Sequence, residues 1–270
     1  VISNINNNNA NKVDGFLKKV IIRSLQICNE TDGAFDITVA PIVNNYGFGA
    51  KENNFTLDDS NLSQYIGCDK ILIENNLIQK KDKSVEIDVN GIAQGFSVDV
   101  LVGYLKKNGI SNFIINIGGE VFCAGTKRGS PWLVAIEKPF QNMQLQKYII
   151  KLSNQALATS GSYRKIKKLE NKIISHTMNP KTFYPVENSL ISVSIMADNC
   201  MDADAYATAC MSMGLEKSKE FVNQKGIEAC FIYKEKNDTL TYITSGLLKL
   251  VSSNSPDFLD LQSSLGGAPQ

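Results

Sequence analysis

The chain has 270 residues, 43% of them hydrophobic and 20% charged, and its 28 basic and 27 acidic side chains leave a formal net charge of +1. This content is enough for a substantial core, whereas the lack of a strongly basic tract argues against a surface that neutralises nucleic-acid phosphates. No apolar run approaches the roughly 18 residues that a membrane-spanning helix requires.

The chain opens at Val1 rather than at Met, so we expect that its native start has been removed, and a signal peptide or lipid anchor could have stood upstream. Residues 3–11 are rich in asparagine and predict an exposed loop. A helix is predicted next, because Asp14 can cap it and apolar side chains then recur with a 3.6-residue period until about Gly33.

An apolar stretch and three predicted strands follow this helix. Residues 34–43 form an apolar stretch that ends in a glycine-bearing loop. Two short strands, residues 71–74 and 77–80, are joined by two asparagines, which tolerate the positive φ of a tight hairpin. We expect a third strand over residues 85–89 and then a helix over residues 96–107.

The second half of the chain is rich in strands. Two helices are also expected there, near residues 201–213 and 216–224. Runs of strands with a few inserted helices indicate one α+β domain of mainly antiparallel sheet over residues 1–250, and the polar residues 251–270 predict a flexible tail. The expected strands are FIINI, EVFCAG, WLVAIE, YIIKLS, LISVSIMA, EACFIYK and TLTYITS.

The six cysteines are scattered, with no C-x-x-C motif and no histidine at zinc-ligand spacing. Their even number permits disulfides, but most lie in apolar segments, so we predict buried free thiols that behave as small hydrophobic side chains. The redox state of the compartment stays open.

The most informative segment is CMDADAYATACM, residues 200–211. On a helix, Asp204 and Thr208 are four residues apart and share a face among small alanines. A carboxylate and a hydroxyl on one face suit a hard cation such as Mg²⁺, which prefers oxygen ligands. The alternative is a polar helix face, capped by Asp202, with the threonine bonded back to a helix carbonyl; on spacing alone this is the commoner arrangement.

A second segment, DVNGIAQGF, lies at the passage from the third expected strand to the helix. Gly91 and Gly95 let the main chain approach a ligand, and the N-terminus of the following helix favours an anion. Asp88, at the strand end, could accept hydrogen bonds from a base or a ribose. The alternative is an ordinary turn before a helix.

Two further segments bring glycines and hydroxyls together. Gly118 and Gly119, followed by Glu120, indicate a bulge or a close backbone approach inside a strand, or else a kink in a curved sheet. Thr159 and Ser160, in ATSGSYR, can line a phosphate or flavin site, or else cap a hydrogen-bonded turn.

The only histidine, His176, lies in SHTMNPKT. Its imidazole is the side chain of this sequence whose ordinary pKa suits a general base near neutrality, although a histidine without a role is the commoner case.

Together and in this order, these segments resemble the FAD:protein FMN transferase (ApbE) family. The resemblance runs through GAFDITVAPIVNNYGFG, IDVNGIAQGFSVD, NIGGEV, ALATSGSYR, HTMNPKTFYPV and CMDADAYATACMSMG, and it covers roughly residues 3–250. It implies a single ApbE-like domain and an enzyme of that activity.

The resemblance also implies roles for individual residues. His176 matches the family's base. Asp204 and Thr208 look like metal ligands, together with the backbone carbonyl of Gly91 and the main chain at Ala207. The implied FAD contacts include a strand at Ala34, Phe35 and Asp36. The remaining implied FAD contacts are Asp88, Gln94, Gly118, Gly119, Glu120, Thr159, Ser160 and Met178.

The implied reaction uses Mg²⁺ and FAD, and transfers FMN to a threonine or serine hydroxyl of an acceptor flavoprotein with release of AMP. Family acceptors carry a Ser/Asp-Gly-Ala-Thr/Ser type of motif. The alternatives are an FAD pyrophosphatase, which gives FMN and AMP, and a flavin-binding protein without turnover. Family habit further implies an extracytoplasmic location, periplasmic and tethered to the membrane through the N-terminus.

This sequence departs from the family pattern at three places. Gln94 stands where many relatives have lysine, so one cationic contact to FAD is missing. Phe183 stands where glycine is usual, and its side chain could reshape the turn after His176. The family's N-terminal strand, which helps to enclose FAD, is not found in the sequence from Val1 onward, and we expect it to lie before Val1.

Overall fold

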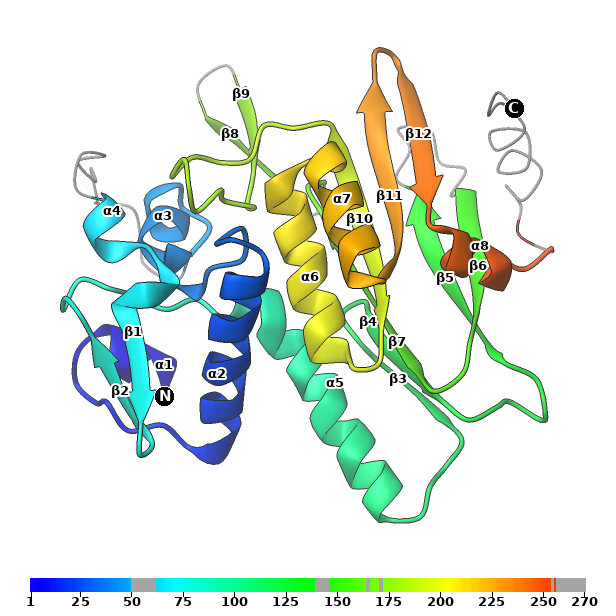
Figure 1. Cartoon of the computed structure of the whole chain (residues 1–270), viewed down its shortest axis with the longest axis horizontal. Helices are drawn as coiled ribbons and strands as arrows, with labels where there is room; N and C mark the ends of the chain where they lie inside the picture. Colours follow the sequence, from blue (N-terminus) through cyan, green and yellow to red (C-terminus); the bar gives the residue numbers. More distant parts are fainter. Residues whose placement is uncertain (50–61, 139–145, 164–165, 170–171, 254, 256–270) are drawn as a thin grey trace.

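A six-stranded antiparallel sheet with the order β12-β11-β10-β7-β4-β3 runs through the molecule (Figure 1). The computed structural model describes residues 1–49, 62–138, 146–163, 166–169, 172–253 and 255. This six-stranded sheet confirms the predicted α+β fold of mainly antiparallel sheet. The strands are β3 (Phe113–Ile117), β4 (Glu120–Ala124), β7 (Gln155–Gly161), β10 (Leu190–Ala197), β11 (Glu228–Glu235) and β12 (Asp238–Ile243).

Helices cover one face of this sheet: α5 (Asn90–Lys107), α6 (Cys200–Met213) and α7 (Leu215–Lys225), with α2 (Gly15–Glu30) beyond them (Figure 1). Their apolar side chains form the larger core cluster. The helices α5 and α6 approach closely, because a Cβ atom at Gly95 would lie only 2.2 Å from the carbonyl oxygen of Cys200. Gly95 therefore serves helix packing, whereas the sequence had suggested a ligand contact.

The opposite face of the sheet is covered by the hairpin β5 (Trp132–Lys138) and β6 (Gln146–Leu152) and by α8 (Ser245–Leu250). The packed chain continues past α8, into the predicted tail. Val251 and Ser252 are buried, and the backbone N–H of Ser252 donates to the carbonyl of Ile149 at 2.7 Å. Residues 256–270 of the predicted tail lie outside the described residues.

The N-terminal elements form a layer beside α2 (Figure 1). The asparagine-rich loop prediction is wrong for residues 3–6, which belong to helix α1; Ile5 is buried and Asn6 exchanges two hydrogen bonds with the backbone of Ile87. The other elements are α1 (Ile2–Asn6), η1 (Ile37–Val39), α3 (Ala40–Asn45), α4 (Leu62–Tyr65), η3 (Cys68–Lys70), β1 (Ile71–Glu74) and β2 (Leu77–Lys80).

Local sequence patterns predicted most features of this layer correctly. Asp14 caps α2 by accepting from the backbone of Leu17, and Asn75 and Asn76 have the positive φ values, 47° and 65°, of a tight hairpin. Residues 85–89 are not a strand, although Val85 and Ile87 are buried. None of the helices among the described residues is long and apolar enough to cross a membrane.

Two predictions about particular residues are corrected. The helix α5 starts at Asn90 and not near residue 96, so Gly91 and Gly95 lie inside it. Gly118 and Gly119 form the two-residue turn between β3 and β4, with φ of 64° and 121°, rather than a bulge within a strand.

The prediction of buried free thiols is correct for four of the six cysteines. Cys28 and Cys68 form a disulfide, whereas the other four cysteines are buried free thiols. The pair is 40 residues apart in the sequence and belongs to different elements, so no local pattern revealed it.

Candidate functional site

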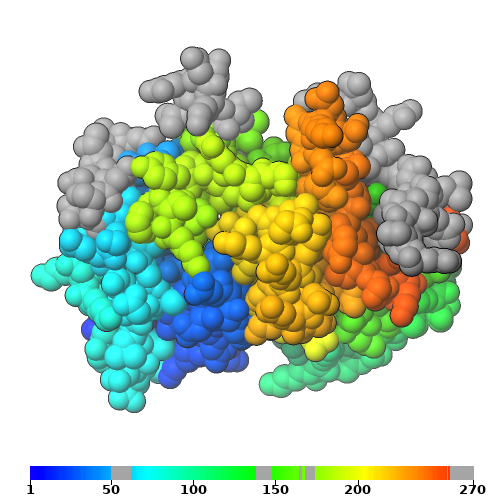
Figure 2. All heavy atoms as spheres, turned by 45° about the horizontal axis from the view of Figure 1, so that its top comes forward, coloured from blue at the N-terminus to red at the C-terminus, as the bar shows by residue number. Residues whose placement is uncertain are grey.

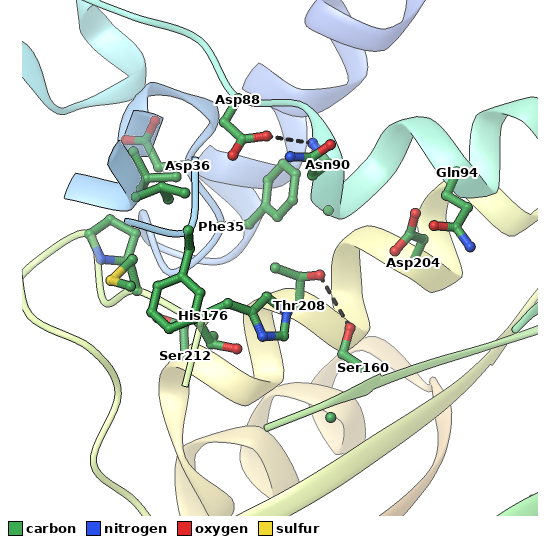
Figure 3. A pocket seen from close by; sticks show the side chains of 18 of the residues that line it. Phe35, Asp36, Asp88, Asn90, Gln94, Ser160, His176, Asp204, Thr208 and Ser212 are labelled. Carbon is green, nitrogen blue, oxygen red and sulfur yellow. Dashed lines mark hydrogen bonds between the residues drawn. The ribbon is translucent and has the colours of Figure 1, made fainter. Parts of the chain in front are cut away.

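A cavity of about 350 Å³ opens where α5, α6 and β7 meet the segments that follow α2 and β9 (Lys172–Ser175) (Figure 3). In Figure 2 the yellow-green segment after β9, which carries His176, lies between the blue and cyan N-terminal layer and the gold helices. Most of the predicted site residues line this cavity: Ala34, Phe35, Asp36, Asp88, Gly91, Gln94, Gly118, Glu120, Thr159, Ser160, His176, Met178, Asp204 and Thr208.

Helix α6 presents Asp204, Thr208 and Ser212 to the cavity at a spacing of four residues. The start of this helix is well capped, because Asn199 accepts from the backbone of Asp202, and Asp99 accepts from the N–H groups of Cys200 and Met201 at 2.8 Å each. Asp99 belongs to α5, so these bonds tie the start of α6 to α5.

Asp204 is a buried carboxyl group with little compensation. The backbone N–H of Gly95 donates to its Oδ2 at 3.0 Å. Burial raises the pKa of Asp204 to about 7, and the nearby negative charge of Glu120, which is also buried, adds to the shift. A divalent cation would supply a positive charge beside the buried carboxyl group of Asp204.

The hydroxyl of Thr208 lies close to Ser160 and to Gly91. This hydroxyl is 3.3 Å from that of Ser160 on β7, and a Cβ atom at Gly91 would lie 3.0 Å from it. With Asp204, this arrangement supplies the oxygen donors that a hard cation such as Mg²⁺ prefers. The residues present therefore fit a divalent metal.

Two predicted site residues do not line the cavity. Ala207 is fully buried in the larger core cluster and does not line the cavity. Gly119 is in the β3–β4 turn, where its backbone N–H bonds Asn116, and only Gly118 reaches the lining.

Residues 34–36 form the opposite wall of the cavity, and they are irregular rather than the strand that the family resemblance implied. The N–H of Phe35 donates to the hydroxyl of Thr31 at 3.1 Å. The carboxylate of Asp36 accepts from both the backbone and the hydroxyl of Thr38, so it starts η1. Burial nevertheless raises the pKa of Asp36 above its ordinary value.

Asp88 and Gln94 are held by local hydrogen bonds. Asp88 accepts from the backbone of Asn90 at the start of α5, at 2.8 Å. The amide of Gln94 donates to the carbonyl of Ile117 at 2.7 Å, and a Cβ atom at Gly118 would lie 1.9 Å from that nitrogen. Gln94 is thus anchored to the β3–β4 turn, and glycine at 118 leaves the room for its side chain.

His176 enters the cavity directly after β9, beside Thr208 and Ser212 (Figure 3). Its ring centroid is 6.3 Å from that of Phe48, with a tilt of 59°. In the turn that follows, Phe183 adopts a left-handed φ of 66°, a conformation in which glycine would be unstrained. The N–H of Phe183 bonds the carbonyl of Asn179 at 2.8 Å.

Several residues that line the cavity were not predicted from the sequence. Ser212 continues the spacing of Asp204 and Thr208 by one turn, so the helical period could have revealed it. Phe48 and Val43 carried no comparable signal, because only the tertiary structure brings α3 and the loop after it to the cavity. The lining residues that were not predicted are Val39, Val43, Phe48, Asn90, Gly161, Thr177, Pro180 and Ser212.

Known proteins are similar to this chain in sequence and in fold. The ApbE family matches residues 1–231. The FAD:protein FMN transferase of Vibrio cholerae is 34% identical over 238 residues, which make up 86% of this chain and 71% of that protein. The corresponding protein of Escherichia coli is 31% identical over 234 residues, 83% of this chain and 67% of that protein. The solved structure of flavin transferase ApbE from Vibrio cholerae has a TM-score of 0.79 and 32% identity, and the match covers 89% of this chain and 78% of that one.

Proposed function

Because the chain belongs to the ApbE family, whose curated members include FAD:protein FMN transferases, we propose that it is an enzyme that transfers the FMN part of FAD to a protein. The observation that carries this proposal is the convergence of His176, Asp204 and Thr208 on one cavity from segments far apart in the chain. That cavity also gathers polar groups that can hold FAD.

We further propose that Asp204 and Thr208 hold a divalent cation, with Mg²⁺ as the first candidate, and that the backbone carbonyl of Gly91 assists them. When bound, the cation would offset negative charge on the diphosphate of FAD. The raised pKa of Asp204 supports this assignment, because a buried carboxyl group needs a nearby positive charge in order to ionise.

The proposed chemistry is a phosphoryl-type transfer. His176 takes the proton of a threonine or serine hydroxyl on the acceptor protein. The hydroxyl oxygen then attacks the phosphorus of the FMN half of FAD, the bond from that phosphorus to the bridging oxygen breaks, and AMP leaves with that oxygen. The product is a phosphoester between FMN and the acceptor.

We also propose an acceptor, a location and a set of residues that bind FAD. The acceptor is a flavoprotein with a Ser/Asp-Gly-Ala-Thr/Ser type of motif, and the location is extracytoplasmic. Asp36, Asp88, Gln94 and Met178 bind FAD, together with the hydroxyls of Thr159 and Ser160, because their side chains border the same space as His176.

Incubation of the chain with FAD, Mg²⁺ and a protein domain that carries the acceptor motif tests this function. Mass spectrometry of the acceptor is expected to show the added mass of FMN, with AMP in solution. Free FMN and AMP with an unmodified acceptor would instead identify an FAD pyrophosphatase. Bound, intact FAD without product would identify a flavin-binding protein.

A further inference from the structure

The disulfide between Cys28 and Cys68 borders the wall of the FAD cavity. Cys28 lies near the end of α2 and is buried, whereas Cys68 starts η3 and is half-buried. The sulfur atoms and a carboxylate oxygen of Asp36 lie within 4.8 Å of one another. The bond therefore stands directly behind a residue that lines the cavity.

The backbone beside each cysteine also contacts the segment that contains this wall. The carbonyl of Cys28 accepts from the N–H of Gly33 at 2.7 Å, in the turn just before the wall. Gly67, directly before Cys68, donates its N–H to the hydroxyl of Thr38 at 2.7 Å, in η1 just after the wall.

The wall is therefore bonded on one side to the backbone at Cys28 and on the other side to the backbone next to Cys68. The segment between Gly33 and η1 is irregular, and its N–H groups at Ala34 and Phe35 bond Thr31, directly after α2. If the elements that the disulfide joins separate, Thr38 loses its bond from Gly67, and the carboxylate of Asp36 loses its position beside the two sulfur atoms. The crosslink acts on the cavity through these contacts and not by touching FAD.

We propose that Cys28 and Cys68 are positioning residues, whose disulfide holds the wall at Ala34, Phe35 and Asp36 in the shape that binds FAD, so that reduction of the bond weakens FAD binding. This inference rests on the proposed function, since it takes FAD as the ligand of the cavity. The reductant is a dithiol: its two thiols form a disulfide, the Cys28–Cys68 bond breaks, and both cysteines receive a proton and become thiols. The first attack falls on Cys68, the more exposed partner.

Quenching of FAD fluorescence, with Mg²⁺ constant throughout, measures this effect without any transfer step. Reduction of the wild-type chain, and the double variant Cys28→Ser with Cys68→Ser, are each expected to raise the Kd for FAD about tenfold, because the wall is no longer held in advance. The double variant is expected to show no further response to the dithiol. Alkylation of the unfolded, unreduced chain is expected to modify four of its six cysteines.

Leu247→Ala provides the matched control, because Leu247 is fully buried in the cluster on the other face of the sheet, away from the wall. It is expected to lower the melting temperature and to leave the Kd for FAD unchanged. An equal loss of FAD affinity in this variant would reduce the disulfide to general stabilisation and overturn the inference.

The other outcomes are equally decisive. Equal FAD affinity in the oxidised and reduced chain overturns the inference and leaves the proposed function standing. Six alkylated cysteines in the unreduced chain overturn it as well. If the oxidised chain binds no FAD at all, the proposed function fails and the inference fails with it.

Discussion

At the scale of single residues, the cavity combines two buried carboxyl groups, Asp204 and Glu120, with one imidazole, His176. An apolar environment penalises the ionised form of a carboxyl group, so Asp204 retains its proton to a higher pH than an exposed aspartate. A protein that only needed a stable helix would gain nothing from this burial. The arrangement is therefore better explained by a ligand that brings positive charge.

Asp204 has a consequence for stability in the metal-free protein. Its pKa is raised from 3.8 to about 7, so between these values the folded chain holds a proton that the unfolded chain has released. Its contribution to stability is full below pH 3.8 and is lost as the pH rises to about 7. We expect Asp204→Asn to remove this loss, as measured by urea unfolding in a chelator at about pH 5 and about pH 8.

The control for this measurement is Asp238→Asn, which changes an exposed carboxylate in β12 and is expected to leave the pH profile as it is. An identical fall in stability for wild type and Asp204→Asn would contradict the assigned burial. In the presence of Mg²⁺ and FAD, Asp204→Asn is expected to lose the metal-dependent transfer of FMN.

His176 makes a different prediction, because a base acts on the attacking hydroxyl and not on FAD. His176→Ala is expected to lower kcat for FMN transfer by about 10²–10⁴-fold. The Kd for FAD is expected to stay within about twofold of wild type, since ground-state binding is separate from proton removal. Steady-state kinetics and fluorescence titration measure the two effects. A large loss of FAD affinity with an unchanged rate would exclude the base role.

At the scale of elements, the site depends on the close contact of α5 and α6, which places Gly91 against Thr208 and Gly95 against Asp204. A glycine inside a helix lowers its stability by about 0.8–1.0 kcal/mol relative to alanine, so Gly95 must be offset by packing. The Cβ clearance at this position shows the reason, since the nearest atom belongs to the backbone of Cys200 and cannot rotate away.

This contact predicts opposite effects for two glycines of the same helix. Gly95→Ala is expected to destabilise the chain by about 1–3 kcal/mol, because the methyl group forces α5 and α6 apart. Gly103→Ala, which adds a methyl group with no atom within 4 Å, is expected to stabilise it by up to about 1 kcal/mol. Urea unfolding of both variants measures the difference. A gain of stability at both positions would show that the helices do not pack as described.

At the scale of the whole molecule, the cavity is enclosed by segments from residue 34 to residue 212. The strands β11 and β12 complete one edge of the sheet that supports these segments, and the chain after α8 pairs with β6 of the hairpin on the far face of the sheet. Val251 forms a bridge with Ile150, and Ser255 bonds the backbone of Ile149 at 3.2 Å. The smaller core cluster therefore extends beyond the boundary that the sequence suggested.

Two truncations test this boundary. A chain that ends after Leu250 is expected to lose about 1.5–3 kcal/mol of stability, because the buried side chain of Val251 is removed. A chain that ends after Ser255 keeps this side chain and both backbone contacts, so it is expected to be the more stable of the two. Thermal unfolding of the two chains, compared directly, decides the point; equal melting temperatures would place the boundary back at Leu250.

The sequence by itself determined what depends on neighbouring residues. The hairpin at Asn75 and Asn76, the capped start of α2 at Asp14, and the common face of Asp204 and Thr208 all follow from spacing within a few residues. The order of the motifs was enough to indicate the family, because each motif is short and contiguous.

Only the tertiary structure decided what depends on contacts between distant segments. The start of α5 at Asn90, the pairing of Cys28 with Cys68, and the position of Phe48 beside His176 have no signal in local spacing. Each is set by which surfaces pack together, and packing joins segments whose separation along the chain no local pattern records. Even the role of Gly95 changed for this reason, from a ligand contact to the close approach of two helices.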